Sequence, residues 1–314
     1  MEEITKNSHI SKLAPGHRTC AGCAFPSIVR TVLDASDDPI IVTSATGCLE
    51  VTTTIYPETS WNVPFIHSAF ENAAATISGM ETAHEVLVRK QQNGTLATSL
   101  SYNLPTKINF IAFGGDGGTY DIGLQSLSGA LERGHNFLYV CYDNEGYMNT
   151  GGQRSGATPS GAATSTTPIG EHSLGKSQER KNLMEICAAH NIPYCAQASV
   201  SNLADLKNKA KKAFSIKGPK FINVLSPCPT VWKFPPSQFI NIAKLAVETK
   251  FWPLYEIEGG KYKINYEPKE FVPIEEFLKS QKRFSHLFSG RGPESIAKMQ
   301  RQVELEWEKL RKKS

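Results

Sequence analysis

The sequence predicts an α/β fold: a doubly wound, mostly parallel sheet covered by helices. Short apolar runs rich in strand-forming residues alternate with segments whose apolar residues recur at helical spacing. The clearest unit is a strand at 108–113, a helix at 123–133 and a second strand at 137–142. Such alternation is typical of parallel sheets, because neighbouring parallel strands need a long crossover that a helix supplies.

The same alternation continues along the chain. We expect the other elements of this part as follows: a strand at 40–43, a helix at 181–190, a strand at 193–198, a helix at 203–214 and a strand at 221–225. After Pro235 the pattern changes, and we expect a helix at 239–251, a hairpin at 255–266 and a last helix at 294–312. This change predicts one domain at 1–235. A C-terminal helical extension at 236–314 would pack on it or form an arm at a subunit interface.

Length and composition are those of a globular enzyme subunit. The chain has 314 residues, 40% of them hydrophobic and 20% charged, which is ordinary for a globular protein. Its formal net charge of +4 is too small, and its basic residues too scattered, to indicate nucleic-acid binding. The first residues lack the order of a signal peptide, and no window of about 18 apolar residues could span a membrane. We expect a cytoplasmic protein.

Gly115-Asp116-Gly117 and the later Asn144 form the most informative motif. The glycines follow a buried strand, where a backbone can approach a ligand closely. Asp116 and Asn144 follow consecutive strands, whose carboxyl ends lie at one edge of a parallel sheet. The Asp116 carboxylate, the Asn144 amide oxygen and a backbone carbonyl near Gly146 are donors that Mg²⁺ accepts together with phosphate oxygens. The motif predicts a magnesium and diphosphate site, which the loop at 151–175 would cover.

Seven cysteines fall into two groups. Cys141, Cys187 and Cys195 lie within predicted strands or a helix, where a cysteine is usually a small core residue. The others lie near glycine or proline in predicted turns: Cys20, Cys23, Cys48 and Cys228. In a cytoplasmic protein such thiols indicate a metal site or reactive thiols rather than disulfides. They suit either a tetrahedral Zn²⁺ or a [4Fe-4S] cluster, and of the two only the cluster could accept electrons from a neighbouring cofactor.

From residue 15 to about 235 the chain resembles the beta subunits of the 2-oxoacid:ferredoxin oxidoreductases, enzymes that use thiamine diphosphate. The resemblance rests on these segments: PGHRTCAGC at 15–23, TGC at 46–48, SWNVP at 60–64, FENAAA at 70–75, GGDGGTYDIG at 114–123, YDNEGYMNTGGQRS at 142–155 and LSPCPT at 225–230. Together these segments are highly specific. They imply a sheet of the thiamine-diphosphate-binding, diphosphate-domain type.

The resemblance also implies a set of site residues. One [4Fe-4S] cluster would be ligated by Cys20, Cys23, Cys48 and Cys228. Mg²⁺ would be held by Asp116, Asn144 and the backbone of Gly146. The thiamine diphosphate would be lined by Gly115, Asp116, Gly117, Cys48, Asn144, Gly146 and Asn149. Of these, Cys48 and Asn149 are the expected catalytic residues.

The implied reaction is the oxidative decarboxylation of a small 2-oxoacid, with electrons passing through the cluster to ferredoxin. We find no second α/β series that could supply the glutamate that activates thiamine, and Glu71 begins a helix of the diphosphate domain itself. We therefore expect an alpha-type partner subunit to supply that glutamate. Further cluster-bearing subunits, including gamma or delta chains, would complete the complex. The use of coenzyme A is left open, and no nucleic-acid or membrane partner is expected.

Three questions stay open at this point. Ala24-Phe25 and Gly152 depart from the pyruvate pattern, so the substrate could be oxalate, split into two CO₂ without coenzyme A. A non-redox thiamine diphosphate lyase or decarboxylase subunit with a structural zinc site is the main alternative function. A non-catalytic electron-transfer subunit is a third possibility. It would keep the cysteines without binding thiamine diphosphate and Mg²⁺.

Overall fold

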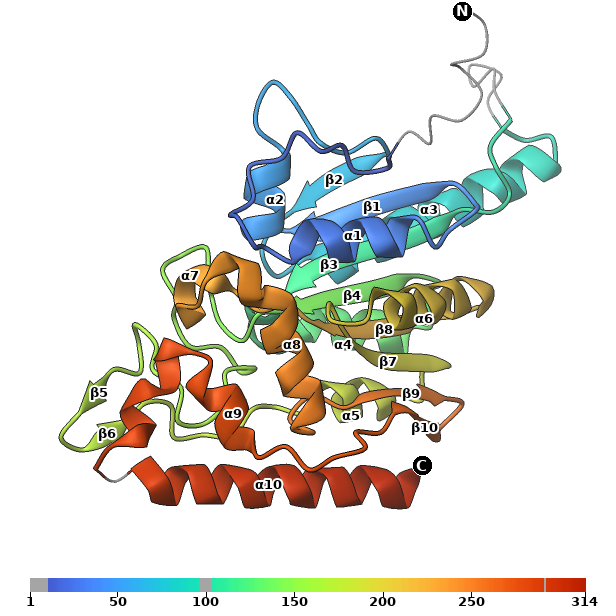
Figure 1. Cartoon of the computed structure of the whole chain (residues 1–314). Helices are drawn as coiled ribbons and strands as arrows, with labels where there is room; N and C mark the ends of the chain where they lie inside the picture. Colours follow the sequence, from blue (N-terminus) through green and yellow to red (C-terminus); the bar gives the residue numbers. More distant parts are fainter. Residues whose placement is uncertain (1–10, 97–102, 291) are drawn as a thin grey trace, which may run out of the picture.

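An eight-stranded sheet organises the described part of the chain, which comprises residues 11–96, 103–290 and 292–314 of this computed structural model. The strand order is β10-β9-β7-β8-β4-β3-β1-β2 (Figure 1). The bounds are β1 Ile40–Ala45, β2 Phe65–Ser68, β3 Asn109–Gly115, β4 Leu138–Asp143, β7 Tyr194–Ser199, β8 Lys220–Leu225, β9 Leu254–Glu258 and β10 Lys261–Tyr266. Within this sheet, the pairs β7/β9 and β9/β10 are antiparallel and the others are parallel. A separate small hairpin joins β5 (Ile169–Gly170) to β6 (Ser173–Leu174).

Helices connect most of the strands. Their bounds are α1 Phe25–Leu33, α2 Cys48–Thr53, α3 Ala73–Gln92, α4 Leu124–Glu132, α5 Leu183–Ala188, α6 Leu203–Ser215, α7 Pro229–Trp232, α8 Phe239–Glu248, α9 Ile274–Lys279 and α10 Gly292–Lys313. Shorter turns are the π-helix η1 (Gly117–Asp121) and the 3₁₀ helices η2 (Pro236–Gln238) and η3 (Lys282–Phe288). Among the residues the structure describes, no helix combines the length and the hydropathy that crossing a membrane requires.

Helices cover both faces of the sheet. On one face α1, α6 and α8 contribute Ile28, Leu206 and Ala243 to one apolar core. On the other, α3 and α4 contribute Ile77 and Leu127 to a second core. All residues of β4, β7 and β8 are buried, which explains why the central strands are largely apolar rather than alternating. The predicted doubly wound, mostly parallel fold is confirmed.

The residues after Pro235 join this architecture. The predicted hairpin forms β9 and β10, and it extends the main sheet because Tyr194 of β7 pairs with Glu258 of β9. The apolar stripe of α10 packs on its own chain, with Met299 and Trp307 buried. Figure 1 shows α10 running alongside α9 and the β9–β10 edge. The C-terminal segment therefore adds two strands as well as helices.

The sheet changes direction between β1 and β3. From β1 the chain moves to β2 at one edge, whereas from β3 it moves to β4 on the opposite side. In open α/β sheets this arrangement leaves a crevice at the carboxyl ends of the two strands, where ligands usually bind. The segments after β1, β3 and β4 all reach this crevice, and they carry Cys48, Asp116 and Asn144.

Candidate active site

A cavity of about 120 Å³ lies in this crevice. Its wall includes every residue expected to line a cofactor: Cys48, Gly115, Asp116, Gly117, Asn144, Gly146 and Asn149. Phe70, Tyr142 and Tyr147 add aromatic surface. Sequence segments about one hundred residues apart are thus brought together by the ends of three adjacent parallel strands.

Asp116, Asn144 and Gly146 meet at one point of this wall. One terminal atom of the Asn144 amide lies 2.8 Å from both Asp116 Oδ1 and the Gly146 carbonyl oxygen. If that atom is the nitrogen, it donates a hydrogen bond to each oxygen, which suits the chain without a metal. If it is the oxygen, three oxygens face one another, and a cation satisfies them. The donor set therefore fits Mg²⁺.

Asp116 is held from two sides. Ser155 Oγ donates to Asp116 Oδ2 at 2.5 Å, and the Asn144 backbone N–H donates to Oδ1 at 3.3 Å. Burial, reinforced by the charge of Asp143, raises the pKa of the Asp116 carboxyl well above its usual range. A divalent cation beside this carboxylate would offset the cost of burying its charge. Ser155, expected only as part of the 151–175 loop that would cover the site, thus supports the candidate metal ligand.

Gly117 and Gly118 let the backbone pass close to the aromatic wall. A Cβ atom at Gly117 would lie 2.5 Å from the Tyr147 ring, and one at Gly118 would lie 3.1 Å from the Phe70 ring. Gly117 also begins the π-helical turn η1, a feature common at functional sites. Tyr142 Oη is buried without a partner among the described residues, as fits a wall completed by a ligand. The glycine turn, like the oxygen donors, fits a bound diphosphate.

Four cysteines gather beside this cavity. Cys20 and Cys23 lie in the turn before α1, and Cys228 lies directly before α7. Cys48 is the first residue of α2 rather than a loop residue as expected, and its Sγ is 3.9 Å from Asn149 Oδ1. Burial and then the nearby thiolate charges raise the pKa of Cys23 and Cys48 to about 12. Thiolates this close together are stabilised by a positively charged centre.

The remaining thiols are structural. Cys141, Cys187 and Cys195 are almost fully buried in the second core, as predicted. Within residues 11–96, 103–290 and 292–314, no three His, Cys, Asp or Glu side chains are placed to hold a single metal ion. The four cysteines near the cavity are associated, since their charges act on one another's pKa.

A buried ion-pair network stands behind the metal donors. Glu145, between Asn144 and Gly146 in sequence, has a left-handed φ of 63°, a conformation that L-residues rarely adopt. Its carboxylate accepts from Arg283 Nη2 at 2.5 Å and from Arg180 Nη1 at 3.2 Å. Sequence reasoning missed this network, because its members are 35 and 138 residues from Glu145.

The same network anchors the C-terminal segment to the site. The Arg283 guanidinium stacks 3.8 Å above the Trp232 ring, and Trp232 Nε1 donates to the Asn144 carbonyl oxygen at 2.9 Å. Trp232 ends α7, the short helix that Cys228 precedes. One aromatic side chain therefore connects the turn that bears the metal donors, the cysteine group and the C-terminal segment.

Known proteins share both the sequence and the fold. Residues 45–224 match the family model described as thiamine pyrophosphate enzyme, C-terminal TPP binding domain. The chain is 53% identical to pyruvate synthase subunit PorB of Methanocaldococcus jannaschii, over 93% of each chain. It is 51% identical to pyruvate synthase subunit PorB of Thermotoga maritima, over 95% of this chain and 90% of that relative. Ketoisovalerate oxidoreductase subunit VorB of Pyrococcus abyssi is 44% identical, over 95% of this chain and 91% of that relative.

The chain belongs to the beta-subunit family of the 2-oxoacid:ferredoxin oxidoreductases. The beta subunit has the same fold as a solved 2-oxoglutarate:ferredoxin oxidoreductase from Magnetococcus marinus. That structure has 2-oxoglutarate, coenzyme A and succinyl-CoA bound. That likeness has a TM-score of 0.54 and 22% identity, and it covers 69% of this chain and 66% of the other. The resemblance seen in the sequence and the enzyme class are confirmed.

The beta subunit carries one thiamine diphosphate-binding domain. Its described residues build a single large sheet, without a second α/β series beside it. Glu71, the one internal candidate for the activating glutamate, lies in the turn before α3 and is half-buried. The relatives are named as subunits, of pyruvate synthase and of ketoisovalerate oxidoreductase.

Proposed function

We propose that this beta subunit holds the diphosphate end of thiamine diphosphate and oxidatively decarboxylates pyruvate within its complex. One observation carries the proposal: an Asn144 amide atom lies 2.8 Å from both Asp116 Oδ1 and the Gly146 carbonyl oxygen. This point lies beside the four associated cysteines. In this assignment those three residues bind Mg²⁺. Gly115 and Gly117 let the backbone approach the diphosphate, and Cys48 and Asn149 lie nearest the reacting atoms.

The bound cofactor would supply the nucleophilic carbon that attacks the oxoacid carbonyl and stabilise the negative charge left by loss of CO₂. The chain's own contribution is to bind and orient. Phe70 and Tyr147 limit the access of water to the cavity, since they form part of its wall. The amide of Asn149, beside Cys48 Sγ, would position the substrate.

We further propose that Cys20, Cys23, Cys48 and Cys228 ligate one [4Fe-4S] cluster rather than zinc. Zinc has no redox chemistry, so it could not accept electrons from the cofactor. A [4Fe-4S] cluster would give the oxidoreductase an electron acceptor at the cofactor. A lyase subunit with a zinc site, the alternative function, would have no such electron acceptor.

The partners are proposed from the single large α/β sheet that the described residues form. An alpha-type subunit would supply the glutamate that activates thiamine, further cluster-bearing gamma or delta chains would extend electron transfer, and ferredoxin would receive the electrons. Residues 1–235 would form the cofactor domain, and 236–314 would form an extension that secures it through Arg283. All seven cysteines are unpaired, which suits the reducing cytoplasm we propose as the location.

Substrate identity is proposed from the relatives alone. Pyruvate is favoured because the PorB relatives are named pyruvate synthase subunits, while the ketoisovalerate enzyme makes a branched 2-oxoacid the second choice. Anaerobic assays of the complete complex should follow viologen reduction with pyruvate, 3-methyl-2-oxobutanoate and oxalate, each with and without coenzyme A. Pyruvate should give the highest kcat/KM. A higher value with oxalate would replace this assignment.

Cofactor binding is tested separately from turnover. We expect Asp116→Ala to weaken Mg²⁺-dependent thiamine diphosphate binding to the complex by more than about tenfold in calorimetric titrations. The exposed Asp34→Ala serves as the control.

Iron analysis and EPR spectroscopy of Cys228→Ser, with Cys187→Ser as the matched buried control, test the cluster. Unchanged iron content in Cys228→Ser would remove Cys228 from the ligand set.

A further inference from the structure

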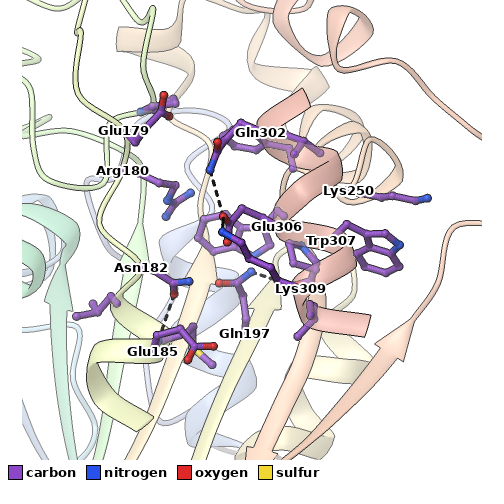
Figure 2. A pocket seen from close by; sticks show the side chains of 18 of the residues that line it. Glu179, Arg180, Asn182, Glu185, Gln197, Lys250, Gln302, Glu306, Trp307 and Lys309 are labelled. Carbon is purple, nitrogen blue, oxygen red and sulfur yellow. Dashed lines mark hydrogen bonds and ion pairs between the residues drawn. The ribbon is translucent and has the colours of Figure 1, made fainter. Parts of the chain in front are cut away.

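A second cavity, larger than the cofactor cavity, lies away from the cofactor crevice. It has a volume of about 440 Å³, within the range of about 300–1,000 Å³ typical of ligand pockets. The segment 179–185, which ends in the first turn of α5, and strands β7 to β9 form one side, and α10 closes the other (Figure 2). Its walls are rich in aromatic and aliphatic side chains, among them Trp252, Tyr255, Met299 and Trp307.

Arg180 gives this cavity a polar floor. Its Nη1 donates to Glu145, and its Nη2 donates to Asp143 and to Tyr120 Oη. Its Nε has no acceptor among the described residues, although a guanidinium has five N–H donors. The side chain keeps 23% of its surface exposed and lies on the loop side of the cavity, facing α10 (Figure 2). Arg180 can therefore donate to a ligand without giving up its buried partners.

The charges around the cavity favour an anion. Five basic and three acidic side chains line it. Lys309 is paired with Glu306, and Lys313 with Glu185. Lys250 has no carboxylate partner in the described residues and stands 5.2 Å from the centre of the Trp307 ring. Lys250 thus leaves positive charge at the apolar walls, whereas Arg180 is paired with Asp143 and Glu145 and contributes N–H donors rather than unpaired charge.

We propose that this cavity binds an amphipathic monocarboxylate, with its carboxylate on Arg180 and its apolar body along the aromatic walls and α10. The site is distinct from the cofactor cavity, with which it shares no lining residue. It nevertheless lies close to the metal donors, because Arg180 also binds Asp143 and Glu145, the neighbours of Asn144. A pyruvate molecule would leave most of the cavity empty, so the ligand has a larger apolar part than the proposed substrate.

The test uses 3-phenylpropionate and its uncharged analogue 3-phenylpropionamide in calorimetric titrations of the assembled complex. Phenylpropionate should bind saturably, and the amide at least about tenfold more weakly, the equivalent of about 1.4 kcal/mol. Val303→Trp, which places a large ring in the cavity wall, should abolish binding. Leu305→Trp on the same helix is the matched control, because Leu305 is 57% exposed, and it should bind as the unaltered complex does.

Three outcomes would overturn the proposal. These are no saturable binding below about 1 mM, equal affinity for the acid and the amide, or equal loss of binding in both tryptophan variants. Asp116→Ala in the cofactor cavity should leave phenylpropionate affinity unchanged. Loss of phenylpropionate binding in that variant would instead place the probe in the cofactor site. The binding assay needs no turnover, so its result is independent of the proposed reaction.

Discussion

At the scale of single residues, the site depends on Glu145 as much as on the donors beside it. The positive φ of Glu145 allows the Asn144 side chain and the Gly146 carbonyl to face the same point. The Glu145 side chain itself is directed to Arg180 and Arg283. The two arginines hold the Glu145 carboxylate in a fully buried position. A buried ion pair adds little net stability compared with apolar packing. Its value here is to fix one local conformation.

We therefore predict that Glu145→Gln weakens Mg²⁺-dependent thiamine diphosphate binding by about 10- to 100-fold, the usual effect of losing a group that orients a metal ligand. The amide keeps the shape of the side chain but leaves Arg283 without its ionic partner, so stability should also fall by roughly 3–5 kcal/mol. Calorimetry with Mg²⁺ and the thermal midpoint measure the two effects.

The double variant Glu145→Gln with Arg283→Met separates positioning from simple destabilisation. Removing both charges should restore much of the stability, because no uncompensated arginine remains, while cofactor affinity should stay low. Full recovery of both properties would argue against a positioning role. Glu185→Gln, at a partly exposed surface pair with Lys313, is the matched control and should leave cofactor affinity unchanged.

At the scale of elements, the turns after the strands determine the shape of the site. The turn after β3 enters a π-helix with two glycines against aromatic rings, and the turn after β4 carries Glu145. Tyr147 itself is fixed, because its Oη donates to Asp121 Oδ2 at 2.9 Å. The Tyr147 ring therefore has little freedom to move away from a methyl group added at Gly117.

Gly117→Ala is predicted to abolish cofactor binding with only a moderate loss of stability. The new Cβ atom would lie 2.5 Å from the Tyr147 ring, so either the ring or the turn must shift, at a cost of roughly 1–3 kcal/mol. The matched control is Gly79→Ala in α3, where an added Cβ meets nothing within 4 Å. That change should raise stability by about 0.5–1 kcal/mol. Thiamine diphosphate affinity as tight in Gly117→Ala as in Gly79→Ala would refute this role of the turn.

At the scale of the whole molecule, local patterns predicted most of the fold and the candidate ligands. The strand and helix periodicity located β3, α4, β4, β7, α6 and β8, and the Gly115-Asp116-Gly117 motif located the crevice. Helix α2 was missed because its six residues include Val51, Thr52 and Thr53, which are β-branched and disfavour helices. The Glu145 network and the pairing of β9 with β7 were not predictable from local sequence, since both join residues far apart in the chain.

Lys220, at the start of β8 and far from the cofactor edge, gives the whole chain a predicted pH dependence. It is 4% exposed, and its Nζ donates to Asn136 Oδ1 at 2.7 Å. Burial, opposed only in part by the charge of Glu81, lowers the pKa of this lysine to about 7. The unfolded chain, with its ordinary lysine value of about 10.4, then binds more protons than the folded chain above pH 7. The free energy of unfolding should therefore rise with pH across this interval.

Lys220→Met removes both the buried charge and this slope. The variant should be more stable than the unaltered chain at and below about pH 7, by roughly 1–3 kcal/mol, and the gain should shrink steadily as pH approaches 10. Asn136 Oδ1 keeps a donor, because the Gly218 N–H also binds it at 3.1 Å, so no acceptor is left unpaired. Thermal midpoints of the full chain measured across this interval provide the comparison, with the exposed Lys217→Met as control. A gain that does not depend on pH would show that apolar packing, rather than the lysine charge, causes the difference.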